Sequence, residues 1–185
     1  MTFGQMAVAC GIAVAAIAPG RAVAQATGIG QQCSNLACEI QNDWARNNLM
    51  IYGLADAMPA EKFGYKPTPA QQSFGERVMH VVSVDMGLLA TLGAKTPPPA
   101  VNMQAATKGD VLAALRQHAE YGSTVVKEFN DQTLLEQVTS PWFMGPKSSR
   151  QRIVYFLMTH NQDTYGQLVV YLRLNGITPP LSRQP

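Results

Sequence analysis

Two of the three histidines occupy positions from which an imidazole could bind a metal. Between residues 149 and 174 apolar residues recur every three or four positions, and His160 lies on that helical face. His80 lies at the margin of a similar face in an earlier segment. Facing helices of a bundle commonly hold metals, and neutral imidazole is a common ligand. The two histidines could therefore meet at a divalent metal, or they could share only a buried hydrogen bond.

Other candidate side chains give weaker signals. His118 lies between apolar residues without a motif around it, so we interpret it as a structural core residue. Asp85 follows His80 by five residues and does not share its helical face, so we expect Asp85 at the surface. The methionines form no Met-x-x-Met or His-Met cluster, and packing explains them better than copper binding does.

The elements that must position the histidines are expected to be helices. The first spans about residues 35–57, and Pro59 follows its end. The second begins at Ser73, which can form a capping box with Glu76, and it ends at Gly93. His80 therefore belongs to the second helix.

A third helix and a long loop follow. A weaker capping box of Thr107 and Asp110 opens the helix, which continues to Phe129. The loop, residues 131–148, contains the apolar run Trp-Phe-Met at 142–144, and we expect this run to fold back onto the bundle. Exposed apolar loops of this kind favour association, which is the basis for expecting a homodimer.

The last helix begins after Ser148 or Ser149 and ends at Leu174, where Asn175-Gly176 supplies a left-handed residue. Four long helices without a convincing strand pattern predict an all-α fold, a four-helix bundle. A chain of 185 residues can bury one ordinary core, so we expect one domain over residues 35–185.

The N-terminal residues have the pattern of a secretory signal peptide. Residues 6–18 are uncharged and apolar, and a small-x-small cleavage site follows at Ala24. We therefore expect a signal peptide over residues 1–24, a flexible leader over residues 25–34, and a periplasmic or secreted mature protein. An uncleaved anchor is the alternative, although the stretch falls short of the roughly 20 residues of a spanning helix. After cleavage we expect no stable membrane span.

Cys33 and Cys38 are the two cysteines of the expected mature chain. In an oxidising compartment they could form a disulfide, and otherwise they are two thiols near a helix start. A spacing of five suits a disulfide only if the segment between them is not yet helical.

The charge pattern excludes one class of partner. Charged residues make up 14% of the chain, the formal net charge is +2 at pH 7, and acids and bases are interspersed. Nucleic-acid binding normally requires a basic stripe, so we expect no nucleic-acid partner.

Three sequence motifs in order carry a resemblance to a known family. They are Lys-Pro-Thr-Pro at 66–69, Ser-Phe-Gly-Glu at 73–76 with His80 after it, and Tyr-Gly-Gln-Leu-Val-Val-Tyr-Leu-Arg-Leu-Asn-Gly-Ile at 165–177 with Pro179-Pro180. Together they resemble the DinB superfamily of metal-dependent proteins, over about residues 40–183. The resemblance implies a four-helix bundle.

The resemblance also implies a divalent metal, which one histidine of the second helix and an H-x-x-x-H pair on the last helix would bind. His80 matches the first position and His160 the second. Thr164 stands where the family more often has its last histidine, and a hydroxyl is a poor ligand for zinc or nickel. Asp163 could instead complete a two-histidine, one-carboxylate set of the kind that binds iron, or it could be a solvated acid.

Two functions follow from the resemblance. The first is a metal-dependent transferase acting with a thiol or a small electrophile, in which zinc, nickel or iron activates a thiol or water. The second is a metal-free exported bundle that binds a small molecule or serves in stress without turnover. The first function requires a complete set of metal ligands, so Thr164 argues against it. The second function does not require a histidine at position 164. A purely structural pair of histidines is the third interpretation.

Overall fold

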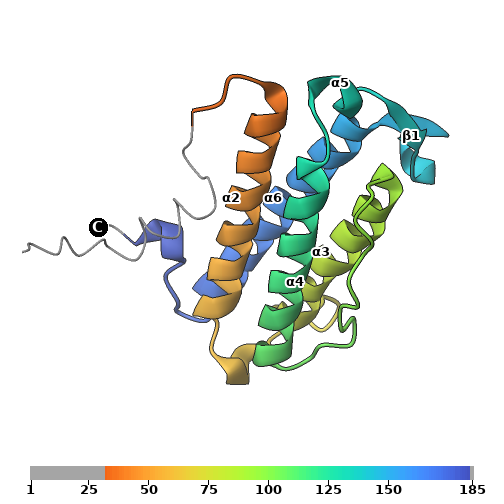
Figure 1. The fold of residues 1–185 in the computed structure, drawn as a ribbon. Coiled ribbons are helices and arrows are strands. Elements are labelled where there is room, and N and C mark those ends of the chain that lie inside the picture. Colours follow the sequence, from red (N-terminus) through yellow and green to blue (C-terminus); the bar gives the residue numbers. More distant parts are fainter. Residues whose placement is uncertain (1–31, 184–185) are drawn as a thin grey trace, which may run out of the picture.

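The computed structural model describes residues 32–183 as a bundle of four long helices (Figure 1). These helices are α2 (Leu36–Ala57), α3 (Phe74–Leu89), α4 (Lys108–Lys127) and α6 (Arg150–Leu174). Both α2 and α3 pack against α4 and α6, so the order around the bundle is α2, α4, α3, α6. The predicted four-helix bundle is confirmed. The predicted signal peptide, residues 1–24, and most of the leader lie outside the described residues.

Helix termini agree with the capping residues expected from the sequence. The Ser73 hydroxyl accepts from the Glu76 N–H, and the Glu76 carboxylate accepts from the Ser73 N–H, which completes a capping box. Thr107 and Ser149, also expected, cap α4 and α6 through their side-chain oxygens. Asn35, which the sequence pattern did not predict as a cap, caps α2 in the same way. These caps fix where the helices that carry His80 and His160 begin.

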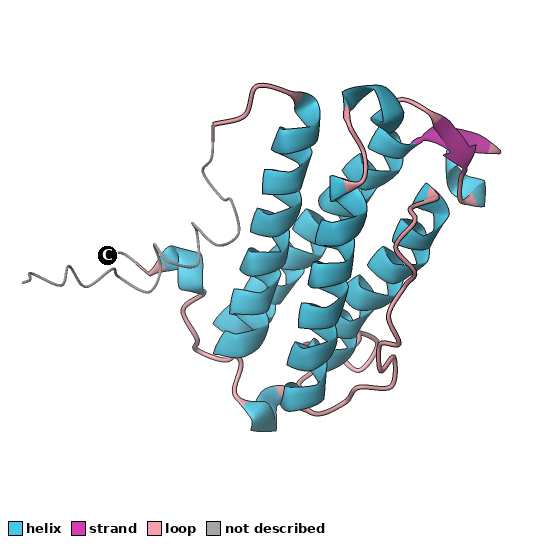
Figure 2. Cartoon of the chain, in the orientation of Figure 1, coloured by secondary structure: helices cyan, strands magenta, loops and turns pink. Residues whose placement is uncertain are grey.

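The connections contain short elements, including a two-stranded ribbon that the sequence pattern did not predict. Strand β1 (Gln137–Thr139) pairs antiparallel with β2 (Lys147–Ser149), with Val138 opposite Ser148 (Figure 2). Strands of three residues are too short to display an alternating pattern, and contacts with the bundle support them. The remaining elements are η1 (Ala60–Lys62), η2 (Ala90–Leu92), α5 (Asp131–Leu134), η3 (Trp142–Met144) and η4 (Pro180–Ser182).

Helices α2 and α4 approach each other closely where Trp44 of α2 packs on Gly122 of α4. The Trp44 side chain is fully buried, and its indole N–H donates to the Ala119 carbonyl at 3.3 Å. A Cβ atom at Gly122 would overlap the Trp44 ring. The glycine therefore sets how near α2 and α4 can lie.

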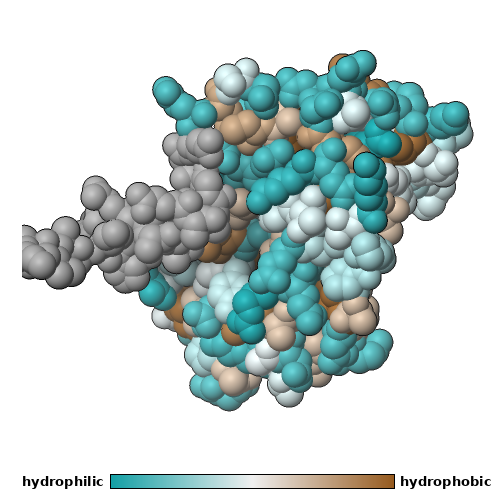
Figure 3. Space-filling model, viewed as in Figure 1, coloured by the Kyte–Doolittle hydropathy of each residue, from teal (hydrophilic) through white to brown (hydrophobic). Residues whose placement is uncertain are grey.

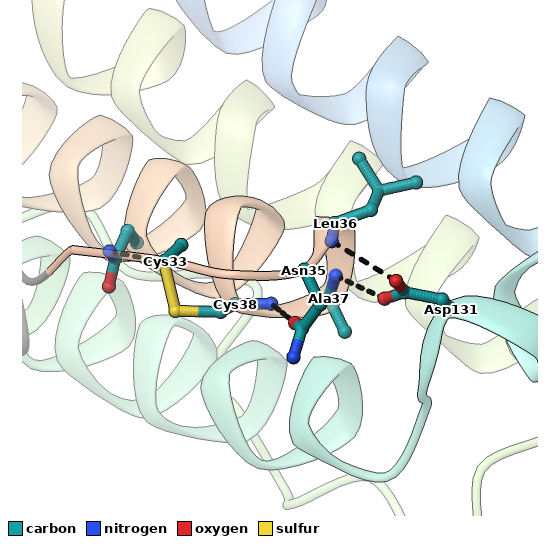
Figure 4. Close-up of a disulfide and its surroundings, with 7 residues drawn as sticks. Cys33, Asn35, Leu36, Ala37, Cys38 and Asp131 are labelled. Atoms are coloured by element: carbon teal, nitrogen blue, oxygen red, sulfur yellow. Dashed lines mark hydrogen bonds between the residues drawn. A yellow bond between two sulfur atoms is a disulfide. The ribbon is translucent and has the colours of Figure 1, made fainter.

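A disulfide and two hydrogen bonds to Asp131, a residue far away in the sequence, fix the start of α2 (Figure 4). Cys33 and Cys38 are joined, with Cys33 before the helix and Cys38 in its first turn. The Asp131 carboxylate accepts from the N–H groups of Leu36 at 3.3 Å and Ala37 at 2.8 Å. These bonds satisfy two of the four free amides at this helix end.

The outer face over α2 and α4 carries mostly hydrophilic side chains, with small apolar areas between them (Figure 3). Of the apolar run in the loop, Met144 is buried, as expected, but Trp142 is 91% exposed. Homodimerisation through this loop stays a prediction. Among residues 32–183 no helix combines the length and hydropathy that crossing a membrane would require.

Candidate metal site

The side chains of His80 and His160 meet between α3 and α6. Their Nε2 atoms lie 3.1 Å apart, and the two rings are inclined at 60°. Both residues are half-buried, at the margin of the core. A hydrogen bond at this distance requires one nitrogen to donate and the other to accept. The structure thus brings together the first two site residues predicted from the sequence.

The separation of the two nitrogens is close to that of two ligands of one metal. Zinc–nitrogen bonds of about 2.0–2.1 Å in a tetrahedral site place two imidazole nitrogens about 3.3 Å apart. Burial lowers the pKa of His80 below its ordinary value, and the neighbouring His160 and Arg77 lower this pKa further, whereas Asp85 opposes them. His80 is therefore biased toward the neutral imidazole, which is the form that binds metals.

The third predicted ligand, Asp163, is not brought to this pair. Its carboxylate is exposed and accepts from the Gln167 amide at 2.7 Å on the same helix. Thr164, at the third motif position, is almost fully buried. Within residues 32–183 no three His, Cys, Asp or Glu side chains are grouped in a way that could hold a metal ion. At this place the described residues offer two imidazole ligands, His80 and His160, for a metal such as zinc.

A cavity of about 430 Å³ opens beside His80. It lies between α3 and the segment that precedes α4, with Met79 and Ser83 on the helix side and Met103 and Gln104 opposite. A volume of this size is in the range of small-molecule sites. His80 is thus accessible from a space large enough for a small ligand.

Asp85, His118 and Asn161 form a buried polar cluster next to the histidine pair. Asp85 is fully buried, so its predicted placement at the surface is wrong. Its Oδ2 lies 3.1 Å from Nε2 of His118 and accepts from the Asn161 amide at 2.8 Å. Because α3 is covered by both α4 and α6, the face turned away from His80 is also interior.

The cluster continues to His160 through Asn161. Asn161 is fully buried, and its Oδ1 lies 3.4 Å from Nδ1 of His160. Sequence reasoning missed Asn161, although a signal was present: positions 157, 161, 164 and 168 follow the four-three-four spacing of a bundle stripe. Asp85 lies in a stripe of the same spacing in α3, formed by positions 78, 82, 85 and 89.

His118 takes the structural place expected of it. It is fully buried on α4, and its Nδ1 lies 2.8 Å from the Leu115 carbonyl oxygen. Both of its ring nitrogens thus have partners within the protein. His118 is therefore a core residue and not part of the half-buried pair formed by His80 and His160.

Comparison with known proteins identifies the family of the chain. The family model that matches the chain is described as the DinB family, and the match covers residues 31–183. The chain belongs to the DinB family. His80, His160 and Thr164 are the positions of this DinB-family protein at which the sequence resemblance predicted a metal site. No curated protein matches the chain.

Two solved DinB-like proteins share the fold of this DinB-family bundle. The crystal structure of one from Bacillus cereus ATCC 10987 has a TM-score of 0.67 and 17% identity, over 76% of this chain and 93% of the other. The crystal structure of one from Bacillus subtilis has a TM-score of 0.62 and 16% identity, over 80% and 99%. At this level of identity the likeness establishes the fold.

Proposed function

We propose that this DinB-family bundle binds a divalent metal through the Nε2 atoms of His80 and His160. The observation that carries the proposal is the convergence of these two nitrogens from different helices. The donors present fit a metal in part, because two imidazoles are in place and water or a ligand would have to complete the coordination. Zinc, nickel and iron(II) all accept imidazole ligands.

The reaction class that we propose is transfer involving a thiol or a small electrophile. A bound metal supplies a Lewis acid, which lowers the pKa of a coordinated thiol or water. His80 and His160 would hold the metal, and water or a small ligand would complete its coordination. The cavity beside His80 supports this proposal because a small molecule can reach that imidazole from it.

A second candidate function is a metal-free bundle that binds a small ligand without turnover. The observation that favours it is the third motif position, where Thr164 replaces a histidine and Asp163 bonds to Gln167 instead. In that case the His80–His160 hydrogen bond is part of the packing between α3 and α6.

We also propose that the protein is exported, as the signal-peptide pattern predicts. The Cys33–Cys38 disulfide supports this proposal, because disulfides persist mainly in oxidising compartments. Export would separate the protein from the cytosolic pool of small thiols, so its thiol partner would have to be present outside the cytosol.

Metal content separates the two candidate functions. The protein is purified without an affinity tag, incubated with zinc, nickel or iron(II), freed of excess ion, and analysed for its elements. We expect one metal per chain in the wild type and strong loss in His80→Ala. The matched control is Ser83→Ala, because Ser83 lies on the same helix and lines the same cavity but provides no imidazole.

The control variant should retain the wild-type metal content. Metal-free wild type under every condition, with His80→Ala as stable as the wild type, would contradict the metal proposal and favour the second candidate. Equal metal content in wild type and His80→Ala would show that the ion binds elsewhere.

A further inference from the structure

The buried cluster of Asp85, His118 and Asn161 lies within hydrogen-bonding distance of His160 through Asn161. We propose that Asn161, oriented by Asp85 and His118, holds neutral His160 in the tautomer with hydrogen on Nδ1. The Nε2 atom of His160 then presents a lone pair toward His80. In this role Asn161 is a positioning residue. The use of this lone pair for metal binding rests on the proposed function, whereas the tautomer of His160 does not.

The hydrogen bonds of the cluster begin at His118. The Leu115 carbonyl oxygen, 2.8 Å from Nδ1 of His118, can only accept a hydrogen bond. Nδ1 of His118 therefore carries a hydrogen. Nε2 of the same ring, 3.1 Å from Oδ2 of Asp85, either carries a second hydrogen or accepts one from the carboxyl group.

Both protonation states of the Asp85–His118 pair orient Asn161 in the same way. If His118 is doubly protonated, Asp85 is a carboxylate and can only accept. If His118 is neutral, the hydrogen on Oδ2 of Asp85 points at His118, and the remaining lone pairs of Oδ2 still accept. In either state the Asn161 NH2 group, 2.8 Å from Oδ2, is the favourable neighbour, and its carbonyl oxygen would be repelled.

The orientation of the Asn161 amide then determines which nitrogen of His160 donates a hydrogen bond. With its NH2 group on Asp85, Asn161 turns Oδ1 toward Nδ1 of His160, 3.4 Å away. An amide oxygen only accepts, so Nδ1 of His160 is the donor and Nε2 has the lone pair. His80 consequently donates from its own Nε2 across the 3.1 Å contact.

The two histidines are therefore unequal before any metal binds. His160 already presents on Nε2 the lone pair that a metal requires. Its other ring nitrogen, Nδ1, donates a hydrogen bond to Asn161, as the second nitrogen of a metal-binding histidine often does. His80 has to move its hydrogen from Nε2 to Nδ1 through solvent, with no net change of charge. The buried cluster prepares one ligand and leaves the other adjustable.

The tautomer is directly visible in a long-range proton–nitrogen correlation NMR spectrum of the tag-free, metal-free protein. The chain has three histidines, so the spectrum is simple and His80→Gln and His160→Gln variants assign it. At a pH well above 6.5, the ordinary histidine pKa, we expect His160 with hydrogen on Nδ1 and His80 with hydrogen on Nε2. A wild-type His160 with hydrogen on Nε2 would overturn the proposal.

Asn161→Leu tests the cause, with Tyr171→Phe as its control. The leucine removes the acceptor, so the His160 signals should move to a mixture in which hydrogen on Nε2 predominates. Tyr171 is a buried residue of the same helix whose hydroxyl donates to the Gln72 carbonyl, away from the cluster, and Tyr171→Phe should keep the wild-type tautomer. An unchanged His160 in folded Asn161→Leu would overturn the role of Asn161. Because no metal is present, failure here is distinct from failure of metal binding.

Discussion

At the scale of single residues, His80 and His160 approach each other from positions 80 residues apart in the chain. Periodicity and family motifs located both histidines, because a helical stripe and a motif are local properties of the sequence. The hydrogen bonds among Asp85, His118 and Asn161 are not local, since each residue comes from a different helix. A polar residue on an apolar stripe signals burial, but its partner becomes known only once the helices are packed.

Thr164→His is the substitution that tests whether the third motif position faces the pair. A third imidazole would replace a hydroxyl that ligates zinc and nickel poorly, so we expect affinity for these ions to rise by at least about tenfold. Calorimetric titration measures the change. Thr159→His, which adds an imidazole on the exposed side of the same helix, should produce no comparable gain. Equal affinity of Thr164→His and the wild type would mean that position 164 does not face His80 and His160.

The lowered pKa of His80 predicts how the stability of the metal-free protein depends on pH. Burial of the imidazole is the main cause, and its ordinary pKa is 6.5. Because the unfolded chain takes up this proton more readily, the free energy of unfolding should fall as the pH drops below 6.5. The loss from this group is complete below the lowered pKa of the folded state.

Urea unfolding at pH values above and below 6.5 measures this dependence in the wild type and in His80→Gln. Glutamine does not titrate, so the variant should lose less stability on acidification than the wild type. Parallel curves for the two proteins would mean that His80 is not perturbed in the folded state.

At the scale of elements, caps and prolines predicted where the helices begin and end more closely than they predicted the connections. The cap at Ser73 and the left-handed Gly176 act within a few residues, so the sequence alone reveals them. The ribbon of β1 and β2 depends on the loop folding back over η2 and α6. Pairing of that kind has no signature in three-residue strands.

Gly122→Ala tests the close approach of α2 and α4. The added methyl group would overlap the fully buried Trp44 ring, so we expect a loss of roughly 1–3 kcal/mol in the free energy of unfolding. Chemical denaturation measures it. Gly166→Ala is the matched control, because its Cβ would meet nothing within 4 Å. That control should be neutral or stabilising by up to about 1 kcal/mol, and equal effects of both substitutions would refute the packing argument.

Asp131→Ala tests the contact that holds the start of α2. The substitution removes the acceptor of two helix-terminal amides, so we expect a loss of about 1 kcal/mol in thermal or urea unfolding. Asp43→Ala removes the same charge from an exposed position of α2 and should stay within about 0.5 kcal/mol of the wild type. A loss as large in Asp43→Ala would attribute the effect to charge alone.

At the scale of the whole molecule, the bundle places a ring of four helices around a core that is polar at one level. Asp85, His118 and Asn161 are fully buried at that level, and His80 and His160 lie next to it at the margin. The fold is that of the DinB family, which the family match and the likeness to solved DinB-like structures establish. The central claim at this scale is that two histidines of the bundle, His80 and His160, suffice to bind an ion.

Titration of zinc into metal-stripped, tag-free protein tests that claim most directly. We expect saturable binding of one ion per chain in the wild type, much weaker binding in His80→Ala, and none in the double variant His80→Ala/His160→Ala. Heat curves without saturable binding in the wild type, or identical binding in the double variant, would contradict a metal site at His80 and His160.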